Sequence, residues 1–246
     1  MNKKFRASAL TLMVLMLGFL SACNTETAKE NEGGEKGQPE VAVNPTPTTG
    51  KLDVLNPNLA SKDEMAAMPH ITEEIAQSIL DNRPFMGMGL LNPFLEEAGL
   101  SEEQRKELYV KMFLPINLNN SDRPTIMMVP GIGKKMAHEF EEYRPYTSIE
   151  QFRREIGKYV DETEVARFES YVFVPVDLNT ASDEEIKRIP GMGKKMLHEF
   201  KEYRPYLNMA QFNREIGKYV DDNELARLRS YVFVSSIPEE KVELEN

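Results

Sequence analysis

The chain of 246 residues contains one cysteine and three histidines, and this scarcity limits both cross-linking and metal chemistry. A single cysteine excludes an internal disulfide framework, so packing must hold any folded part together. His138 and His198 are each followed by glutamate, but neither has the second histidine four residues on that a zinc-protease helix requires. No Asp or Glu pairs with a nucleophile or a histidine in a recognisable catalytic arrangement. The sequence therefore predicts no enzyme activity, no metal site and no cofactor.

The N-terminal region lacks an apolar run long enough to span a bilayer comfortably. The run at 7–20 follows positive charges at Lys3, Lys4 and Arg6, which is the pattern of an export signal. It ends in Leu20-Ser21-Ala22-Cys23, which resembles a bacterial lipobox, where the cysteine is lipidated and becomes the mature N-terminus. We therefore expect a signal peptide over 1–22 and a lipid anchor at Cys23 in the cell envelope. The alternatives are an ordinary signal peptide, or an anchor helix, with an incidental cysteine.

Residues 23–50 have almost no large apolar side chains and are rich in Glu, Gly, Pro and Thr. Such a stretch cannot bury enough surface to offset its ordering entropy, so we expect a disordered tether. Residues 235–246 form a second, short acidic segment. Position 24 is Asn rather than Asp, which by the usual sorting rule of Gram-negative bacteria favours the outer membrane or periplasm.

An excess of basic residues is also missing. Lys and Arg number 30 against 40 Asp and Glu, giving a formal net charge of −10. Proteins that hold nucleic acid through phosphate contacts are usually basic on at least one face. The overall composition therefore favours nucleic-acid binding only if positive charge is concentrated locally.

An internal repeat fills the part of the chain between these segments. Residues 115–174 align with 175–234 without a gap and match at roughly 36 of 60 positions. A less similar copy occupies 51–114, where Asn58, Pro69 and Arg83-Pro84-Phe85 align with Asn179, Pro190 and Arg204-Pro205-Tyr206. Basic against acidic residues count 6 to 11 in the first copy, 8 to 10 in the second and 10 to 10 in the third. The charge balance is thus least acidic in the third copy.

Each of the two similar copies contains a glycine-rich turn between two amphipathic patterns. The turn reads Val129-Pro130-Gly131-Ile132-Gly133-Lys134-Lys135 in one copy and Ile189-Pro190-Gly191-Met192-Gly193-Lys194-Lys195 in the other. Paired glycines permit a sharp turn with positive φ, and the helix that follows exposes backbone N–H groups that favour anions. Ser182 and Glu185 form a capping box before the third-copy turn. These patterns predict a helix-hairpin-helix motif.

In the first copy the corresponding turn reads Pro69-His70-Ile71-Thr72. Both glycines and the lysine pair are absent, so we expect this hairpin to be distorted or built differently.

The second half of each copy carries two further helix patterns. In the third copy Phe212 and Ile216 mark one helical face, and Asp221 or Asp222 caps a helix with Leu225, Leu228 and Val232 inward. Between them, 215–220 and its counterpart 155–160 resemble a degenerate second hairpin with one glycine kept. Residues 173–179 should form an extended connector, since Pro175 disfavours helix. The predicted fold is all-α, with four or five short helices in each copy.

The combination of motifs resembles the ComEA-type helix-hairpin-helix family, named for a bacterial competence DNA receptor. It consists of 176–182, then Ile189-Pro190-Gly191-Met192-Gly193, then Tyr203-Arg204-Pro205-Tyr206. The resemblance implies double-stranded DNA bound through the hairpin backbone and adjacent basic side chains. By position, it implies the DNA-binding candidates Gly131, Gly133, Lys134, Lys135, Gly191, Gly193, Lys194 and Lys195. Other members of the family do structural work, so an envelope scaffold that binds another protein stays open.

Several side chains allow two interpretations. The lysine pairs are phosphate ligands or a solvated polar face at a helix start. Arginines 83, 144 and 204 satisfy carbonyls near a helix C-terminus, which we favour, or contact phosphate. Tyrosines 143, 146, 203 and 206 should pack the hairpins together, and methionines 127, 128, 136 and 196 should fill the core. The sequence thus predicts a non-catalytic lipoprotein that binds DNA non-specifically, with a protein scaffold as the alternative.

Overall fold

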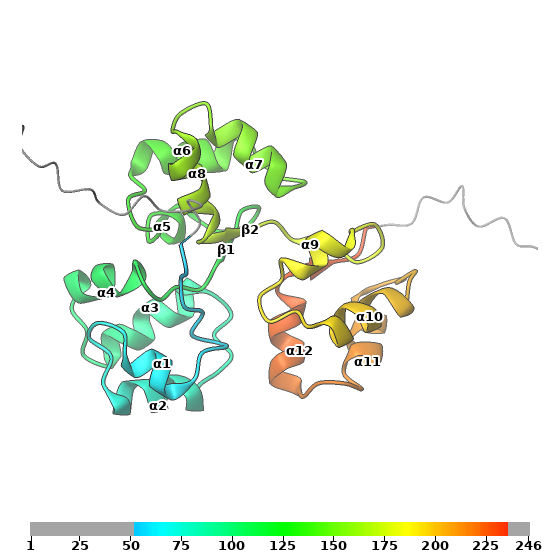
Figure 1. The fold of residues 1–246 in the computed structure, drawn as a ribbon, viewed down its shortest axis with the longest axis horizontal. Helices are drawn as coiled ribbons and strands as arrows, with labels where there is room; N and C mark the ends of the chain where they lie inside the picture. Colours follow the sequence, from blue (N-terminus) through cyan, green and yellow to red (C-terminus); the bar gives the residue numbers. More distant parts are fainter. Residues whose placement is uncertain (1–51, 236–246) are drawn as a thin grey trace, which may run out of the picture. The chain divides into compact units, whose positions relative to one another are not determined.

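The computed structural model describes residues 52–235, and helices dominate this part of the chain, as predicted (Figure 1). The helices are α1 (Lys62–Ala66), α2 (Glu73–Asp81), α3 (Met88–Glu97), α4 (Glu102–Tyr109), α5 (Arg123–Ile126), α6 (Lys134–Glu142), α7 (Ile149–Ile156), α8 (Glu162–Glu169), α9 (Asp183–Lys187), α10 (Lys194–Glu202), α11 (Met209–Ile216) and α12 (Asp222–Arg229). The signal peptide, Cys23, the tether and the acidic end segment lie outside the described residues, apart from Ser235. Among the described helices, none has the length and apolar character needed to cross a membrane.

The helices fall into three consecutive groups of four, which we call the first (52–114), second (115–174) and third (175–235) segments. Each segment begins and ends in extended chain, and the two ends pair in parallel. Leu55 bridges Met112 in the first segment. Strand β1 (Ile116–Asn117) pairs with β2 (Val172–Phe173), and β3 (Val176–Asp177) pairs with β4 (Val232–Phe233). These short pairings close each segment on itself.

The strands correct one prediction and agree with another. Val232 was predicted on the inward face of the last helix, but α12 ends at Arg229 and Val232 is buried in β4. The Tyr231 carbonyl accepts the Val176 N–H, so pairing with a distant strand outweighs continuation of the helix here. The connector between the second and third copies is extended, since β2 and β3 lie on either side of Val174 and Pro175.

Helix starts follow local signals in the sequence. In nine of the twelve described helices the residue before the helix accepts a backbone N–H through its side chain, as Ser, Thr, Asp and Asn caps do. Ser182 and Glu185 form the predicted capping box, and Asp221 rather than Asp222 caps α12. Helices α3, α6 and α10 instead follow Gly87, Gly133 and Gly193, which have no side chain that could accept these bonds.

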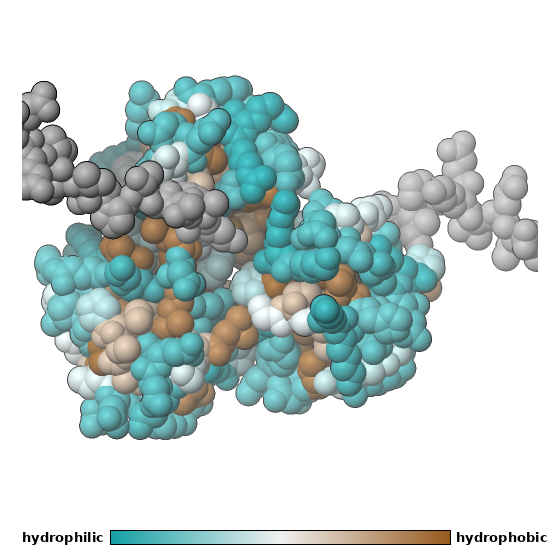
Figure 2. Space-filling view, viewed as in Figure 1, coloured by the Kyte–Doolittle hydropathy of each residue, from teal (hydrophilic) through white to brown (hydrophobic). Residues whose placement is uncertain are grey.

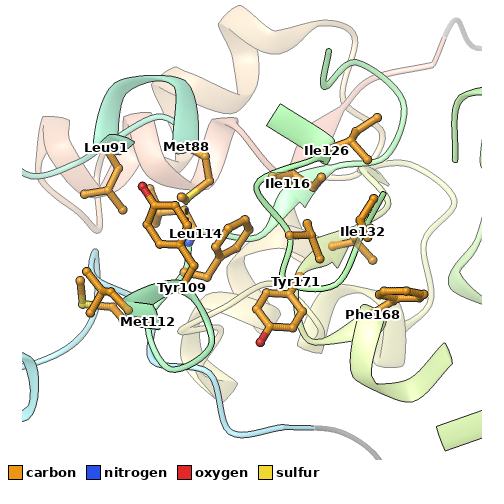
Figure 3. Close-up of a cluster of buried hydrophobic side chains, with 14 of the residues drawn as sticks. Met88, Leu91, Tyr109, Met112, Leu114, Ile116, Ile126, Ile132, Phe168 and Tyr171 are labelled. Atoms are coloured by element: carbon orange, nitrogen blue, oxygen red, sulfur yellow. Dashed lines mark hydrogen bonds between the residues drawn. The ribbon is translucent and has the colours of Figure 1, made fainter. Parts of the chain in front are cut away.

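Two clusters of buried apolar residues form the core of the described region. One spans the first and second segments, and the other lies within the third. Figure 3 shows part of the larger cluster, in which Leu91 of α3 and Tyr109 of α4 gather with Ile116 of β1 and Phe168 of α8. Phe140 of α6 stands edge-on to Phe152 at a ring-centroid distance of 5.2 Å, and Phe200 and Phe212 repeat this contact at 5.2 Å. The same aromatic contact thus recurs in two segments.

The predicted packing residues divide into buried and exposed ones. Tyr146 and Tyr206 are buried, whereas Tyr143 and Tyr203 are half-buried. Met128, Met136 and Met196 pack partly buried against the clusters. Met127 is 40% exposed, so its assignment to the core was wrong. It borders an open groove lined also by Tyr109, Val110 and Ile132, and Figure 2 shows hydrophobic residues gathered between α4 and α5 on a largely hydrophilic face.

The first hairpin was expected to be distorted or built differently; it is built from different side chains, but its turn is not distorted. His70 has φ +64°, close to the +80° of Gly131 and +77° of Gly191. The Ile71 N–H bonds the Met68 carbonyl at 3.3 Å, as Ile132 bonds Val129 at 3.1 Å. Histidine is one of the few non-glycine residues that enter this left-handed region. The turn conformation therefore persists after both glycines are lost.

Candidate nucleic-acid interface

Three turns join the first two helices of each segment, and we call 69–72, 130–133 and 190–193 the first, second and third turns. In the second and third turns, the glycine after proline takes the positive φ. The next glycine, Gly133 or Gly193, is extended, with φ −95° or −87°, and precedes the helix. All four of these glycines are exposed. The structure thus brings the four predicted glycine candidates to the surface, two at the second turn and two at the third.

The helices that follow these two turns have open N-termini. Neither Gly133 nor Gly193 supplies a side-chain cap, and no acidic residue occupies the first turn of α6 or α10. The first N–H groups of a helix have no partner within the helix, and the helix dipole places partial positive charge there. Each helix is nine residues long, so the dipole is developed. An anion is the partner that such a helix end favours.

The four lysine candidates stand at these open ends. Lys134, Lys135, Lys194 and Lys195 are exposed, and within residues 52–235 no carboxylate lies within 4.0 Å of their ammonium groups. The Lys195 ammonium lies 5.7 Å from the ring centroid of Tyr219. Because cations next to a helix N-terminus oppose the dipole, a bound anion would relieve an unfavourable arrangement in both segments.

The first turn differs at the same positions. Thr72 caps α2 by accepting the Ile75 N–H at 3.3 Å, and Glu73 and Glu74 occupy the first helical turn. Thus a side chain satisfies a backbone donor, and carboxylates complement the dipole. This helix start has no need of an external anion and would repel one.

Carboxylates near the second and third turns are mostly paired or buried. Arg123 of α5 binds Glu141 of α6, and this hydrogen bond lowers the pKa of Glu141. Glu139 and Glu199 are buried, and one oxygen of each lacks a hydrogen-bond partner among the described residues.

The Tyr143 and Tyr159 hydroxyls lie 2.8 Å apart, and this hydrogen bond raises the pKa of Tyr159 above its usual range. Tyr203 and Tyr219 repeat the contact at 2.8 Å.

The arginines before proline bind carbonyl groups, as favoured from the sequence. The carbonyls are not those of a helix C-terminus, however. Arg83 donates to the Ala60 carbonyl at 2.5 Å, Arg144 to that of Ser121 at 2.6 Å and Arg204 to that of Ala181 at 2.8 Å. These carbonyls precede the first helix of each segment. The arginines are half-buried, so their role is in holding the chain together.

Sequence reasoning missed two residues that contact the turns. Arg167 of α8 donates to the Pro130 carbonyl, and Arg227 of α12 donates to the Pro190 carbonyl, each at 2.7 Å. The repeat offered a signal, because Arg167 and Arg227 are the sixth residues of the last helix in the second and third segments. The 37-residue separation from the turn, however, hides the contact from any local pattern.

Comparison with known proteins adds nothing to this geometry, since no protein-family model, curated protein or solved structure matches the chain. Within the described part of the chain, no three His, Cys, Asp or Glu side chains gather as metal ligands would. The chemistry of the site itself consists of exposed backbone donors and lysine ammonium groups that suit a phosphate.

Proposed function

We propose that the three segments are copies of a paired helix-hairpin-helix unit of the ComEA-type family, and that the protein binds DNA non-specifically through the second and third turns. The observation that carries this proposal is the open helix start with lysines that have no carboxylate partner among residues 52–235, present at both of these turns and replaced by a capped, acidic start at the first. The protein would be non-catalytic and held at the cell envelope by a lipid on Cys23.

The chemistry of the turns favours contacts to the DNA backbone. Backbone N–H groups and lysines bind phosphate oxygens, and such contacts position a protein without reading sequence. With about four lysines engaged, we expect an affinity in the micromolar range that falls steeply with salt. The second and third segments are nearly balanced in charge, with 8 basic against 10 acidic residues and 10 against 10, so most of the net negative charge lies elsewhere in the chain.

Fluorescence anisotropy of the full chain in detergent, with a short labelled duplex at low salt, tests this proposal. Reversing the lysine pairs (K134E, K135E, K194E and K195E together) should abolish most of the binding, by about 100-fold or more. The control variant K111E changes an exposed lysine of the first segment and should bind within about threefold of wild type. Unchanged binding by the fourfold variant would remove the basis of the proposal.

A scaffold that binds another envelope protein is the second candidate. The acidic first segment favours it, because Thr72, Glu73 and Glu74 close the first turn to phosphate while preserving its backbone form. In this case the hairpins are architecture only. Purification from membrane extracts would then recover one protein partner in stoichiometric amount, insensitive to nuclease, and the lysine reversals would not release it.

A further inference from the structure

Arg167 and Arg227 are each fixed in one orientation beneath a turn. The Nε and Nη2 groups of Arg167 bind both carboxylate oxygens of Glu164 at 2.7 and 2.6 Å, while Nη1 donates to the Pro130 carbonyl at 2.7 Å. Arg227 makes the same three contacts to Glu224 and Pro190, all at 2.7 Å. The planar guanidinium suits this two-sided arrangement, which a lysine cannot reproduce. Each arginine therefore links the last helix of a segment to the turn between its first two helices.

The arginines lie close to the glycines that adopt the positive φ, so a side chain there would have to displace the guanidinium. A Cβ on Gly131 would lie 2.8 Å from Nη2 of Arg167, and all of its near neighbours belong to that arginine. A Cβ on Gly191 would lie 3.2 Å from Nη2 of Arg227 and as close to Leu59. Glycine and arginine thus form a matched pair at each of these turns.

The first segment has exchanged both members of the pair. His70 stands at the glycine position, with positive φ, and Glu107 stands at the sixth position of α4, where Arg167 and Arg227 stand in α8 and α12. Nε2 of His70 lies 2.7 Å from Oε2 of Glu107. The first turn is therefore held by a His–Glu contact in which the last helix contributes the acceptor. This exchange accompanies the capped helix start and Glu73 and Glu74.

We propose that Arg167 and Arg227 are positioning residues that decide which turns accept phosphate, an inference that rests on the proposed DNA binding. A charge-assisted hydrogen bond to the proline carbonyl fixes the turn and offsets the carbonyl's partial negative charge beside the incoming phosphate. A carboxylate at the same place adds negative charge instead. Glycine with arginine is therefore the combination at the turns that accept phosphate, and histidine with glutamate is the combination at the first turn, which does not.

The first experiment replaces Arg167 by lysine in the full chain and measures duplex binding across a salt series. R167K keeps the positive charge but cannot bind Glu164 and the Pro130 carbonyl together, so affinity should fall about tenfold. The slope of log affinity against log salt should stay at the wild-type value, because Arg167 neutralises no phosphate itself. K134E/K135E should instead make that negative slope shallower by about 1.8, or 0.9 per lysine. Wild-type affinity in R167K, or a reduced slope, would overturn the positioning role.

A second experiment is independent of DNA. The variants G131H, R167E and the double variant G131H/R167E copy the first segment's pair into the second, and urea unfolding followed by circular dichroism gives their stabilities. G131H should destabilise because the added imidazole meets the Arg167 guanidinium, and R167E should destabilise because it places a second carboxylate beside Glu164. The unfolding equilibrium constant of the double variant should be at least about tenfold smaller than the product of the two single-variant effects predicts.

The two experiments separate the failure modes. Additive effects in the unfolding cycle would overturn the paired turn contact whatever happens with DNA. Coupled effects together with no DNA binding by the wild-type chain would overturn the proposed function and the phosphate role of the arginines, and would leave the contact as architecture.

Discussion

The first turn and the two glycine turns share a backbone conformation and differ in almost everything that surrounds it. At the first turn, histidine adopts the positive φ, threonine caps the next helix, and two glutamates follow. At the second and third turns, glycine adopts it, no side chain caps the helix, and two lysines follow. The comparison teaches that the turn forms with or without the glycines. The positive φ accounts for the first glycine of each pair, whereas the open helix end and the lysines are not needed for the turn and are the features on which the proposed phosphate binding rests.

The largest effect on stability is expected from a branched residue at a glycine turn. Gly131→Val forces a β-branched side chain to φ +80° and against Arg167, and should cost about 3 kcal/mol. His70→Gly relieves the same strain at the first turn but loses the Glu107 contact, so it should change stability by less than about 1 kcal/mol. Thermal or urea unfolding of the two variants measures this difference. A cost below about 1 kcal/mol for Gly131→Val would show instead that the glycine turn tolerates a branched side chain.

A cap exchange should move stability and binding in opposite directions. Gly193→Ser adds an acceptor for the free N–H groups, and no atom lies within 4 Å of the added Cβ position. It should stabilise by a few tenths of a kcal/mol and weaken DNA binding severalfold, because the side chain competes with phosphate. Thr72→Ala should destabilise by about 1 kcal/mol and leave DNA binding unchanged. If G193S bound DNA as tightly as wild type, the open helix end would have no part in binding.

The smallest effect concerns the buried tyrosines. The hydroxyls of Tyr146 and Tyr206 have no hydrogen-bond partner among the described residues, and burial raises the pKa of both side chains. The first segment carries Phe85 at this position. Tyr146→Phe and Tyr206→Phe should therefore be neutral or stabilise by up to about 1 kcal/mol. A clear loss of stability on unfolding would mean that the hydroxyls bind ordered water.

Local signals in the sequence predicted the helices well. The capping box of Ser182 and the sharp turns at Gly131 and Gly191 depend on neighbouring residues and are present. Of the two cap candidates before α12, Asp221 and Asp222, Asp221 is the cap. The parallel pairings were not predicted, because strands of two residues carry no periodicity and their partners are about 56 residues away. Val232 was misplaced for this reason. The first turn was expected to be distorted because non-glycine residues adopt a positive φ only at a cost, but that cost does not exclude His70 from this conformation.

The candidate site was predicted only in part. The glycines and lysines follow from one contiguous motif, and the structure leaves all eight exposed. Arg167 and Arg227 could not be assigned, because their contact depends on how the last helix packs against the turn. Comparison of the three copies indicates their role only when one sees that the first copy replaces both the glycine, by His70, and the arginine, by Glu107.

The measurement that tests the central claim most directly is the salt dependence of duplex binding for three full-chain proteins: wild type, K134E/K135E and K194E/K195E. If each glycine turn binds phosphate through its lysines, each pair reversal should make the negative slope of log affinity against log salt shallower by about 1.8. A slope that does not change in either variant, or binding that is absent in the wild type at low salt, would contradict the account and leave the turns as structural elements.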